Sequence, residues 1–494
     1  MSVLSLILWI PFAGALLLCL LPPERPRLIR FLALAFALLA LAASWSLPAA
    51  FDGGSGAIQF GESRPWNPEL GSSYSLGVDG FSLPMLMLAT LLALVAMLVS
   101  ARQRERVKGY YVCLLLLEFG IEGVFLARDW ALFYVFWEVT LIPLFFLIDQ
   151  WGGERRHTAS LNFVLYTMGG SVFMLIALLA VYTGSAAHST AMDAMAQAGA
   201  ALPAGQQVLI LAGLLIGFGV KIPVFPLHGW LPLAHVEAPS PVSILLSGIM
   251  LKMGAYGMLR AADMLPQGIA ALQPLLLFLA LASIVYGGLL AWRQSDLKAM
   301  IAYSSISHMG VVVLGISTLN PLGLLGAALQ MSAHGLLAGA LFLLVGLLYE
   351  RTHTREIGDY GCLIQHTPRL AVLMILALLA ALGLPGTAGF VAELHTLIGG
   401  LARWNWWVLP LLLTVLVSAA YALRTILRLF AGPPRPELGR VADLEAHELT
   451  AAGVLVAGIV LLGLVPGPLI GLVAASVGGL VVRLGDFQEL ALLP

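Results

Sequence analysis

Long apolar runs, separated by short polar or Pro/Gly-rich stretches, fill most of this 494-residue chain. A run of about 20 apolar residues matches the helix length that crosses the hydrocarbon core of a bilayer. The pattern therefore predicts an all-α polytopic membrane protein with about 14 transmembrane helices. The expected spans are 2–21, 28–48, 78–100, 109–127, 130–149, 160–183, 206–226, 240–262, 270–292, 297–318, 321–349, 369–400, 405–430 and 448–475.

Two of these spans contain helix-breaking residues. In the seventh, Lys221 is followed by Pro223 and Pro226, and in the twelfth the segment GLPGTAGFVAE surrounds Pro385 and leads to Glu393. Proline removes a backbone donor and clashes with the preceding turn, so the helix bends or unwinds. Unwound backbone at membrane depth persists only where protein or a wet cavity satisfies it. We therefore expect helices 7 and 12 to be broken beside a functional site.

The two breaks suggest an internal repeat. Lys221 follows Glu138 by 83 positions, and Glu393 follows His308 by 85. A break with a nearby charge in each half is typical of inverted-repeat transporters. Two inverted five-helix repeats, helices 4–8 and 9–13, are thus predicted. The expected divisions are 1–108 (N-terminal helices 1–3), 109–262 (first repeat), 263–430 (second repeat) and 431–494 (helix 14 and tail).

Composition supports a membrane protein. The chain is 60% hydrophobic and only 10% charged, too apolar for a soluble protein of this length. Its net charge of -1 and the lack of a charged tail argue against a nucleic-acid partner. Cys19, Cys113 and Cys362 are isolated, so neither a metal site nor a disulfide framework is indicated. The N-terminus lacks a basic n-region and is expected to be a retained helix.

Basic residues concentrate in alternate loops. Eighteen lie in loops after odd-numbered helices, against five in the opposite loops, namely Arg64, Arg128, Arg260, Arg403 and Arg483. Cytoplasmic loops of membrane proteins carry the excess of Lys and Arg. Both termini are therefore expected on the non-cytoplasmic side.

Several ionisable residues fall inside predicted spans, where such groups are rare and usually functional. Only four of the 25 basic residues are lysines, and two of these, Lys221 and Lys252, lie within apolar runs. A lysine can titrate when buried, whereas arginine stays protonated. A carboxylate–lysine pair can exchange its proton when one partner moves. The candidate proton relay comprises Glu138, Lys221, Lys252, His308, His334 and Glu393.

Each candidate also has a structural interpretation. In that interpretation, Glu138 and Lys221 form a static ion pair, and His308 and His334 are core histidines whose ring nitrogens are hydrogen-bonded within the protein. Glu118 and Glu122, four apart on one helix face, suggest proton uptake, a lateral link or a water-lined groove. Lys298 is expected to be a charge at the cytoplasmic edge, and no role is assigned to His395. The chain has no GxGxxG, phosphate loop, cysteine ligand set or Gly-x-Ser-x-Gly elbow, so redox energy must come from partner subunits.

Three segments carry a family resemblance: FYVFWEVTLIPLFFLI, GFGVKIPVFPLHGWLPLAHVEAPSPVSILLSGIMLKMGAYG and LKAMIAYSSISHMG. These segments, and nearly the whole chain with them, resemble the antiporter-like subunits of respiratory complex I, NADH:quinone oxidoreductase. The resemblance is strongest to the M type, which corresponds to mitochondrial subunit 4. The resemblance implies that Glu138 and Lys221 are the key relay pair and Lys252 the central bridge. It implies that His308, His334 and Glu393 continue the path toward the other half-channel.

The resemblance also distinguishes this chain from other subunits of the same kind. L-type and N-type subunits, and Mrp sodium/proton antiporters, typically have lysine where this chain has Glu393, and the L type adds a long C-terminal lateral helix. The segment GFVAELHTL departs from the family, which usually has glycine before this glutamate and phenylalanine after it.

The resemblance implies a proton-translocating subunit in the bacterial inner membrane, beside L-type and N-type subunits. It places NAD, FMN, iron–sulfur clusters and quinone in partner subunits and no cofactor or metal in this chain. The alternatives are an Mrp-type cation/proton antiporter, the same module in a membrane-bound hydrogenase or ferredoxin-linked complex, and a structural scaffold.

Overall fold

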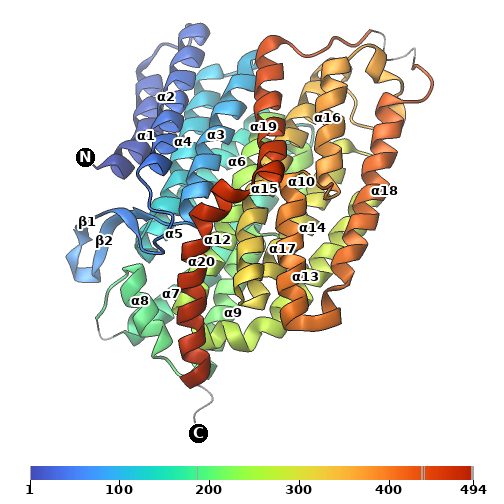
Figure 1. Ribbon diagram of the computed structural model, residues 1–494. Coiled ribbons are helices and arrows are strands. Elements are labelled where there is room, and N and C mark those ends of the chain that lie inside the picture. Colours follow the sequence, from blue (N-terminus) through green and yellow to red (C-terminus); the bar gives the residue numbers. More distant parts are fainter. Residues whose placement is uncertain (1, 186, 436–437, 439, 491–494) are drawn as a thin grey trace.

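The computed structural model describes residues 2–185, 187–435, 438 and 440–490, and most of them are helical (Figure 1). Within these residues, 14 helices are long and apolar enough to cross a membrane, which confirms the predicted class of fold. The first seven helices are α1 (Val3–Leu20), α2 (Pro26–Ser46), α3 (Ser82–Val99), α4 (Val107–Leu126), α5 (Trp130–Val139), α6 (Leu141–Trp151) and α7 (Arg156–Gly184).

The middle of the chain contains the first predicted break. Here α9 (Ala204–Lys221) ends at Lys221, and the short α10 (Leu231–Glu237) follows after an irregular segment. The irregular backbone finds partners in the protein: the indole Nε1 of Trp230 donates to the carbonyl oxygen of Val220 at 2.8 Å, and the amide of Phe225 donates to Ser283 Oγ at 2.9 Å. Next come α11 (Ser240–Leu245), a π-helical turn (Leu246–Met250), α12 (Leu251–Met264), α13 (Pro266–Arg293), α14 (Leu297–Thr318) and α15 (Pro321–Thr352).

The second predicted break separates α16 (Pro368–Ala381) from α17 (Ala388–Trp404). After α18 (Pro410–Phe430), the predicted span 448–475 is wrong, because the chain forms α19 (Ala446–Leu464) and α20 (Gly467–Leu490) instead. Pro466 causes this split: it has no amide proton and disfavours helical backbone at the residue before it. The four predicted divisions remain a prediction, and 491–494 of the last lie outside the described residues.

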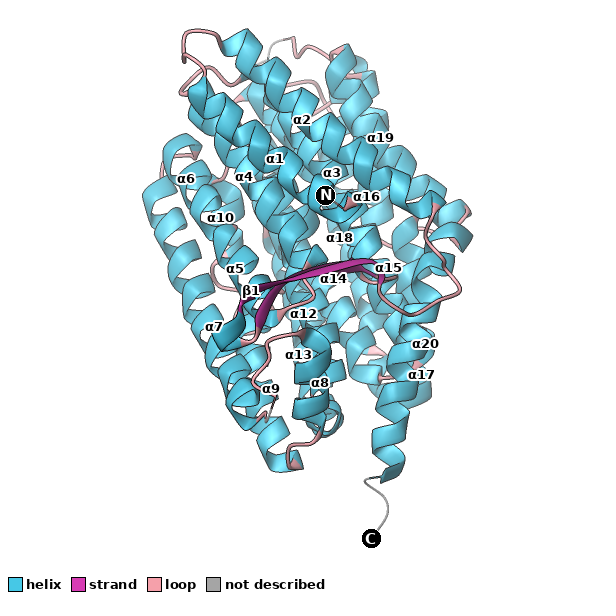
Figure 2. Cartoon of the chain, turned by 90° about the vertical axis from the view of Figure 1, so that its left-hand side faces the viewer, coloured by secondary structure: helices cyan, strands magenta, loops and turns pink. Residues whose placement is uncertain are grey.

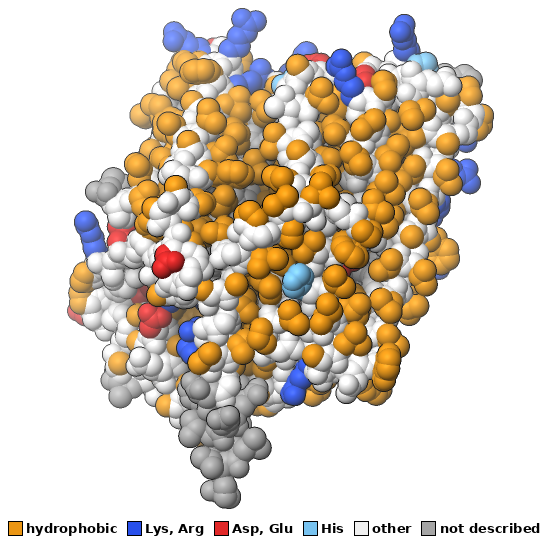
Figure 3. Space-filling model, in the orientation of Figure 1, with side chains coloured by type: hydrophobic (Ala, Val, Ile, Leu, Met, Phe, Trp, Pro, Cys, Tyr) orange, Lys and Arg blue, Asp and Glu red, His pale blue; other side chains and the backbone are white. Residues whose placement is uncertain are grey.

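Both loops expected between early spans contain structure of their own. The segment 49–77 forms an antiparallel hairpin of β1 (Gln59–Asn67) and β2 (Ser72–Val78), and 184–205 contains α8 (Met192–Ala200). Figure 2 shows the hairpin lying across the flank of the helical bundle, with α8 below it. In the space-filling view, hydrophobic side chains cover the flank, and Lys and Arg gather along the upper edge (Figure 3). We call this edge the arginine-rich end. We call the ends of α2 and α7 and the starts of α3 and α5, which lie on the side of the hairpin, the hairpin end.

A buried ion pair joins α3 to α12 at the hairpin end. Asp79 precedes α3, and its Oδ2 lies 2.8 Å from Nη1 of Arg260, with both side chains largely buried. Its Oδ1 accepts the backbone amides of Phe81 and Ser82, each at 3.1 Å. Burial alone would raise the pKa of Asp79, but the charge and the hydrogen bond of Arg260 outweigh burial and hold the pKa below its usual range. The carboxylate therefore remains ionised at neutral pH.

Asp79→Asn is expected to destabilise the fold by about 3–5 kcal/mol, because removing one partner leaves the Arg260 charge buried and unpaired. Thermal unfolding of the purified complex measures this loss. Because the folded-state pKa is depressed, the contribution of Asp79 is complete above its unfolded-state pKa and disappears as pH falls through the folded-state value.

Asp263→Asn is the matched control. Asp263 also pairs with an arginine, Arg483, at 2.5 Å, but both side chains are accessible to solvent, 26% and 50% exposed. Its loss should cost at most about 1 kcal/mol. Equal destabilisation by the two substitutions would contradict the assignment of Asp79 as a buried anchor.

Candidate functional site

Lys252 lies at the centre of the candidate site. It follows the π-helical turn Leu246–Met250 and is completely buried. Its Nζ donates to the carbonyl oxygen of Ser247 at 2.6 Å and lies 2.7 Å from Nδ1 of His334. Such turns widen a helix locally and are frequent at functional sites. The buried amine thus has two polar partners, which is the requirement for a charge at membrane depth.

The polar contacts continue from Lys252 through three helices. His334 on α15 and His308 on α14 lie with ring centroids 5.5 Å apart, and Nδ1 of His308 lies 3.6 Å from Oε1 of Glu393 on α17. Helices α14, α15 and α17 pack against one another. The structure thus brings Lys252, His334, His308 and Glu393 into one continuous array, which we call the central file.

The break between α16 and α17 shapes the end of the central file. Gly383 lies in this break with φ +75°, and a Cβ atom there would lie 2.7 Å from Oε2 of Glu393. A left-handed backbone strains any residue with a Cβ, and this Cβ would also displace the carboxylate. Glycine at this position therefore allows the chain to fold closely around Glu393.

A second glycine brings a neighbouring helix against the same break. A Cβ on Gly463, near the end of α19, would lie 2.3 Å from the carbonyl oxygen of Gly386 and from the Cα of Thr387. Because both are backbone atoms, they cannot move aside as a flexible side chain does. The last turn of α19 therefore packs directly on the unwound segment that leads to Glu393.

Lys221 and Glu138 are not in direct contact. Lys221 is the last residue of α9 and is 1% exposed, and its Nζ has no hydrogen-bond partner. Its Nζ lies 5.1 Å from the ring centroid of Trp137 and 5.8 Å from that of Phe163. Glu138, next to Trp137 on α5, is only half-buried. The expected pair is therefore separated here, and the amine interacts with aromatic faces instead.

His235 is a polar residue of the site that sequence reasoning missed. It lies on α10, just after the first break, and is completely buried with no hydrogen-bond partner for either ring nitrogen. Its ring stacks on Phe342 at 4.5 Å, and it lies within electrostatic reach of both Lys298 and Lys252. A histidine so soon after a proline-broken helix with an inserted charge was the signal that could have identified it.

Lys298 occupies the first turn of α14, and its side chain is buried. It is 3% exposed, and its Nζ donates to the carbonyl oxygen of Ala238, at the end of α10, at 2.7 Å. It lines a cavity of about 880 Å³, together with Arg102, Glu350 and Arg355. Lys298, His235 and Lys252 thus form a sequence of buried basic groups leading inward from this cavity.

Three further candidates lie outside the central file. Glu118 and Glu122 are completely or almost completely buried on α4, and none of their four carboxyl oxygens has a hydrogen-bond partner. His395 places its Nδ1 2.7 Å from the carbonyl oxygen of Val391 on its own helix. No contact in the described chain links these three residues to Lys252 or Glu393.

Comparisons with known proteins agree with this architecture. Residues 127–419 match the family model "NADH:quinone oxidoreductase/Mrp antiporter, TM". The chain is 39% identical to NADH-quinone oxidoreductase subunit M of Rhodobacter capsulatus, over 97% of this chain and 96% of that protein.

Two solved structures are also similar to this chain. A chain of respiratory complex I from Thermus thermophilus is similar with a TM-score of 0.89 and 34% identity, covering 98% of this chain and all of that one. A chain of the Mrp complex from Dietzia sp. has a TM-score of 0.87 at 21% identity, with 99% of each chain covered, and thus shares the fold.

Gly383→Ala is expected to displace the Glu393 carboxylate and to reduce proton translocation, because the added methyl group clashes with Oε2 and the left-handed backbone costs about 1–2 kcal/mol. Proton uptake by vesicles containing the reconstituted complex measures this effect. Gly453→Ala on α19 is the control, because a Cβ there meets nothing within 4 Å. Unchanged translocation in Gly383→Ala would show that the close fit around Glu393 is dispensable.

Proposed function

Since this chain belongs to the NADH:quinone oxidoreductase/Mrp antiporter transmembrane family, we propose that it is the M-type proton-translocating membrane subunit of an NADH:quinone oxidoreductase. The observation that carries the proposal is the central file, in which Lys252, His334, His308 and Glu393 succeed one another between α12 and the second broken helix. A contiguous set of amine, imidazole and carboxyl groups can pass a proton by small displacements, since each group both accepts and releases one.

The proposed path enters from the arginine-rich end. A proton taken up in the cavity beside Lys298 reaches Lys252 by way of His235, and Lys252 shares it with Nδ1 of His334. His308 then passes it to the carboxylate of Glu393. Lys221 controls this transfer by its charge: when Glu138 draws the ammonium toward α5, less positive charge opposes protonation of Lys252.

Redox chemistry belongs to other subunits in this proposal. NAD, FMN, iron–sulfur clusters and quinone bind to partners, because the sequence has no motif for any of them. The neighbouring membrane subunits are of the L and N types. The complex lies in the bacterial inner membrane, with both termini on the non-cytoplasmic side, because the arginine-rich loops then face the cytoplasm.

The principal alternative is an Mrp-type cation/proton antiporter, and its only structural support is the shared fold. Such a protein would exchange Na⁺ for protons in vesicles without NADH. The redox-linked proposal requires instead that proton movement depend on NADH oxidation and stop with inhibition of quinone reduction. Co-purification of NADH-oxidising subunits distinguishes the proposal from a hydrogenase- or ferredoxin-linked complex.

Lys252→Gln is expected to remove most of the proton translocation per NADH oxidised in the reconstituted complex, because glutamine keeps hydrogen-bonding groups but cannot carry the proton. Lys108→Gln is the control: Lys108 Nζ donates to the carbonyl oxygens of Cys19 and Leu21 and touches no member of the file. Full translocation by an assembled Lys252→Gln complex would exclude Lys252 from the path.

Glu138→Gln separates a working carboxylate from a structural one. We expect lost or strongly reduced translocation at an unchanged amount of assembled complex, because the neutral side chain no longer attracts the Lys221 ammonium. Redox-driven acidification of vesicles, normalised to the assembled complex, is the readout. If translocation persists and assembly falls, Glu138 holds the helices together and the proton path excludes it.

A further inference from the structure

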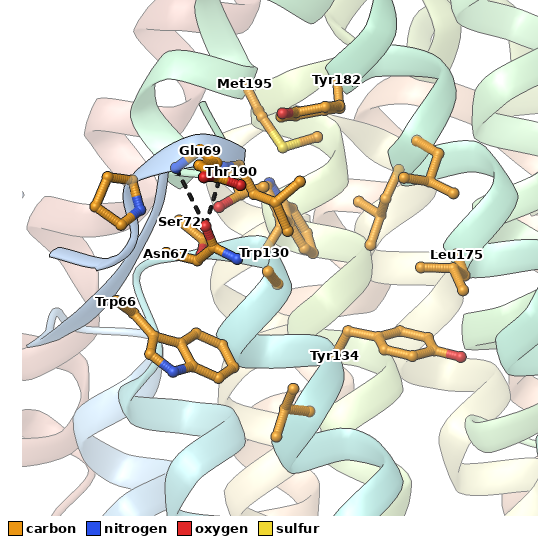
Figure 4. Close-up of a pocket in the computed structure, with 16 residues that line it drawn as sticks. Trp66, Asn67, Glu69, Ser72, Trp130, Tyr134, Leu175, Tyr182, Thr190 and Met195 are labelled. Atoms are coloured by element: carbon orange, nitrogen blue, oxygen red, sulfur yellow. Dashed lines mark hydrogen bonds between the residues drawn. The ribbon is translucent and has the colours of Figure 1, made fainter. Parts of the chain in front are cut away.

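A groove lies on the flank of the bundle, away from the central file. It has a volume of about 600 Å³ and lies between the β1–β2 connection, the start of α5 and the last turns of α7. Figure 4 shows aromatic side chains from all three elements around the space, with Trp66 from the hairpin, Trp130 and Tyr134 from α5, and Tyr182 from α7. A groove of this volume holds a ligand about the size of a small lipid fragment or drug molecule.

One side of the groove is continuous with the membrane-facing surface. Val135 and Leu179 line it and are 40% and 49% exposed, and Ile176, one helical turn from Leu179, is 60% exposed. These helices cross the membrane, so their exposed apolar side chains face acyl chains or a neighbouring subunit. An acyl chain can therefore move from the bilayer into the groove without crossing water.

The opposite side is polar and carries a single charge. Glu69 lies in the turn between the strands, and Asn67 Oδ1 fixes this turn by accepting the backbone amides of Glu69 at 3.1 Å and Leu70 at 3.3 Å (Figure 4). Among the described residues that line the groove, none is lysine or arginine. A carboxylate beside aromatic faces attracts an ammonium group and repels an anionic headgroup.

The position along the membrane normal fits a headgroup. The groove lies at the hairpin end, where α5 begins and α7 ends. Trp and Tyr side chains favour the membrane–water interface, where lipid headgroups lie.

We propose that this groove binds one zwitterionic phospholipid, with its ammonium group at Glu69 and one acyl chain between α5 and α7. We identify the occupant as a lipid because the groove is continuous with the apolar, membrane-facing surface. The carboxylate of Glu69, with no basic residue beside it in the groove, favours a zwitterionic headgroup over an anionic one. The competing occupants are a partner subunit that covers this face and a lipid that binds regardless of its headgroup. The test measures lipid labelling, so its readout does not depend on redox activity.

The test uses the whole purified complex in lipid nanodiscs that contain a photoreactive phosphatidylethanolamine or a phosphatidylglycerol with the same photoreactive acyl chain. Peptides that carry the crosslink are identified by mass spectrometry. We expect the ethanolamine lipid to label 131–135 and 175–182, and unlabelled phosphatidylethanolamine to compete. Glu69→Gln should lower this labelling about threefold to fivefold, to the level of the glycerol lipid.

Two further variants make the result decisive. Glu24→Gln, at an exposed position of the α1–α2 connection, should leave labelling unchanged. Leu178→Trp fills the groove from α7 and should abolish labelling by either lipid while the complex remains assembled. Equal labelling by the two lipids, labelling insensitive to Glu69→Gln, or crosslinks only to a partner subunit would each overturn the proposal.

Discussion

A polar group inside a bilayer has to find its partner within the protein, and this constraint shapes the whole molecule. At the first break, Trp230 and Ser283 satisfy a carbonyl and an amide that a regular helix would have paired itself. At the end of α10, the Lys298 amine takes the carbonyl of Ala238. The chain can leave helical geometry at membrane depth only because neighbouring helices supply these groups. The breaks in turn create the space in which ionisable side chains meet.

The central file shows the same constraint applied to charge. Lys252 has a carbonyl oxygen and an imidazole nitrogen within hydrogen-bond distance, so its amine has partners whether it is protonated or neutral. Lys221 has two aromatic faces near its amine and no hydrogen-bond partner in the described chain, and Glu138 is half-buried. The arrangement around Lys252 suits proton transfer between fixed neighbours, and the arrangement around Lys221 suits a charge whose position varies. This difference supports assigning transfer to Lys252 and control to Lys221.

The sequence predicted well those features that depend on apolar length or on proline. Both broken helices lie where the proline and glycine signals put them. The described residues contain 14 candidate spans, as predicted, although the broken twelfth span is too short to count and the last one forms two helices. The sequence also contained the members of the central file, but their mutual contacts arise from packing of α14, α15 and α17, which periodicity cannot specify.

Three features were missed for physical reasons. The split at Pro466 was masked by a continuous apolar run across it. The β1–β2 hairpin was missed because its strands are largely polar and lack a clear alternation of apolar residues. His235 was overlooked because a single histidine gains its significance from Lys298 and Lys252, which lie on other helices.

The contact between Gly463 and the second break has a mechanical consequence. Because α19 rests on the backbone of Gly386 and Thr387, a rotation of the segment that carries Glu393 must displace α19 as well. At its other end, α19 is tied to α15 by Arg351 and to the 3-10 turn after α3 by Arg102, both through Glu448. The helix, about 28 Å long at about 1.5 Å per residue, therefore connects the second break to the arginine-rich end. A displacement of the break that moves this helix as a rigid body would reach that end as well.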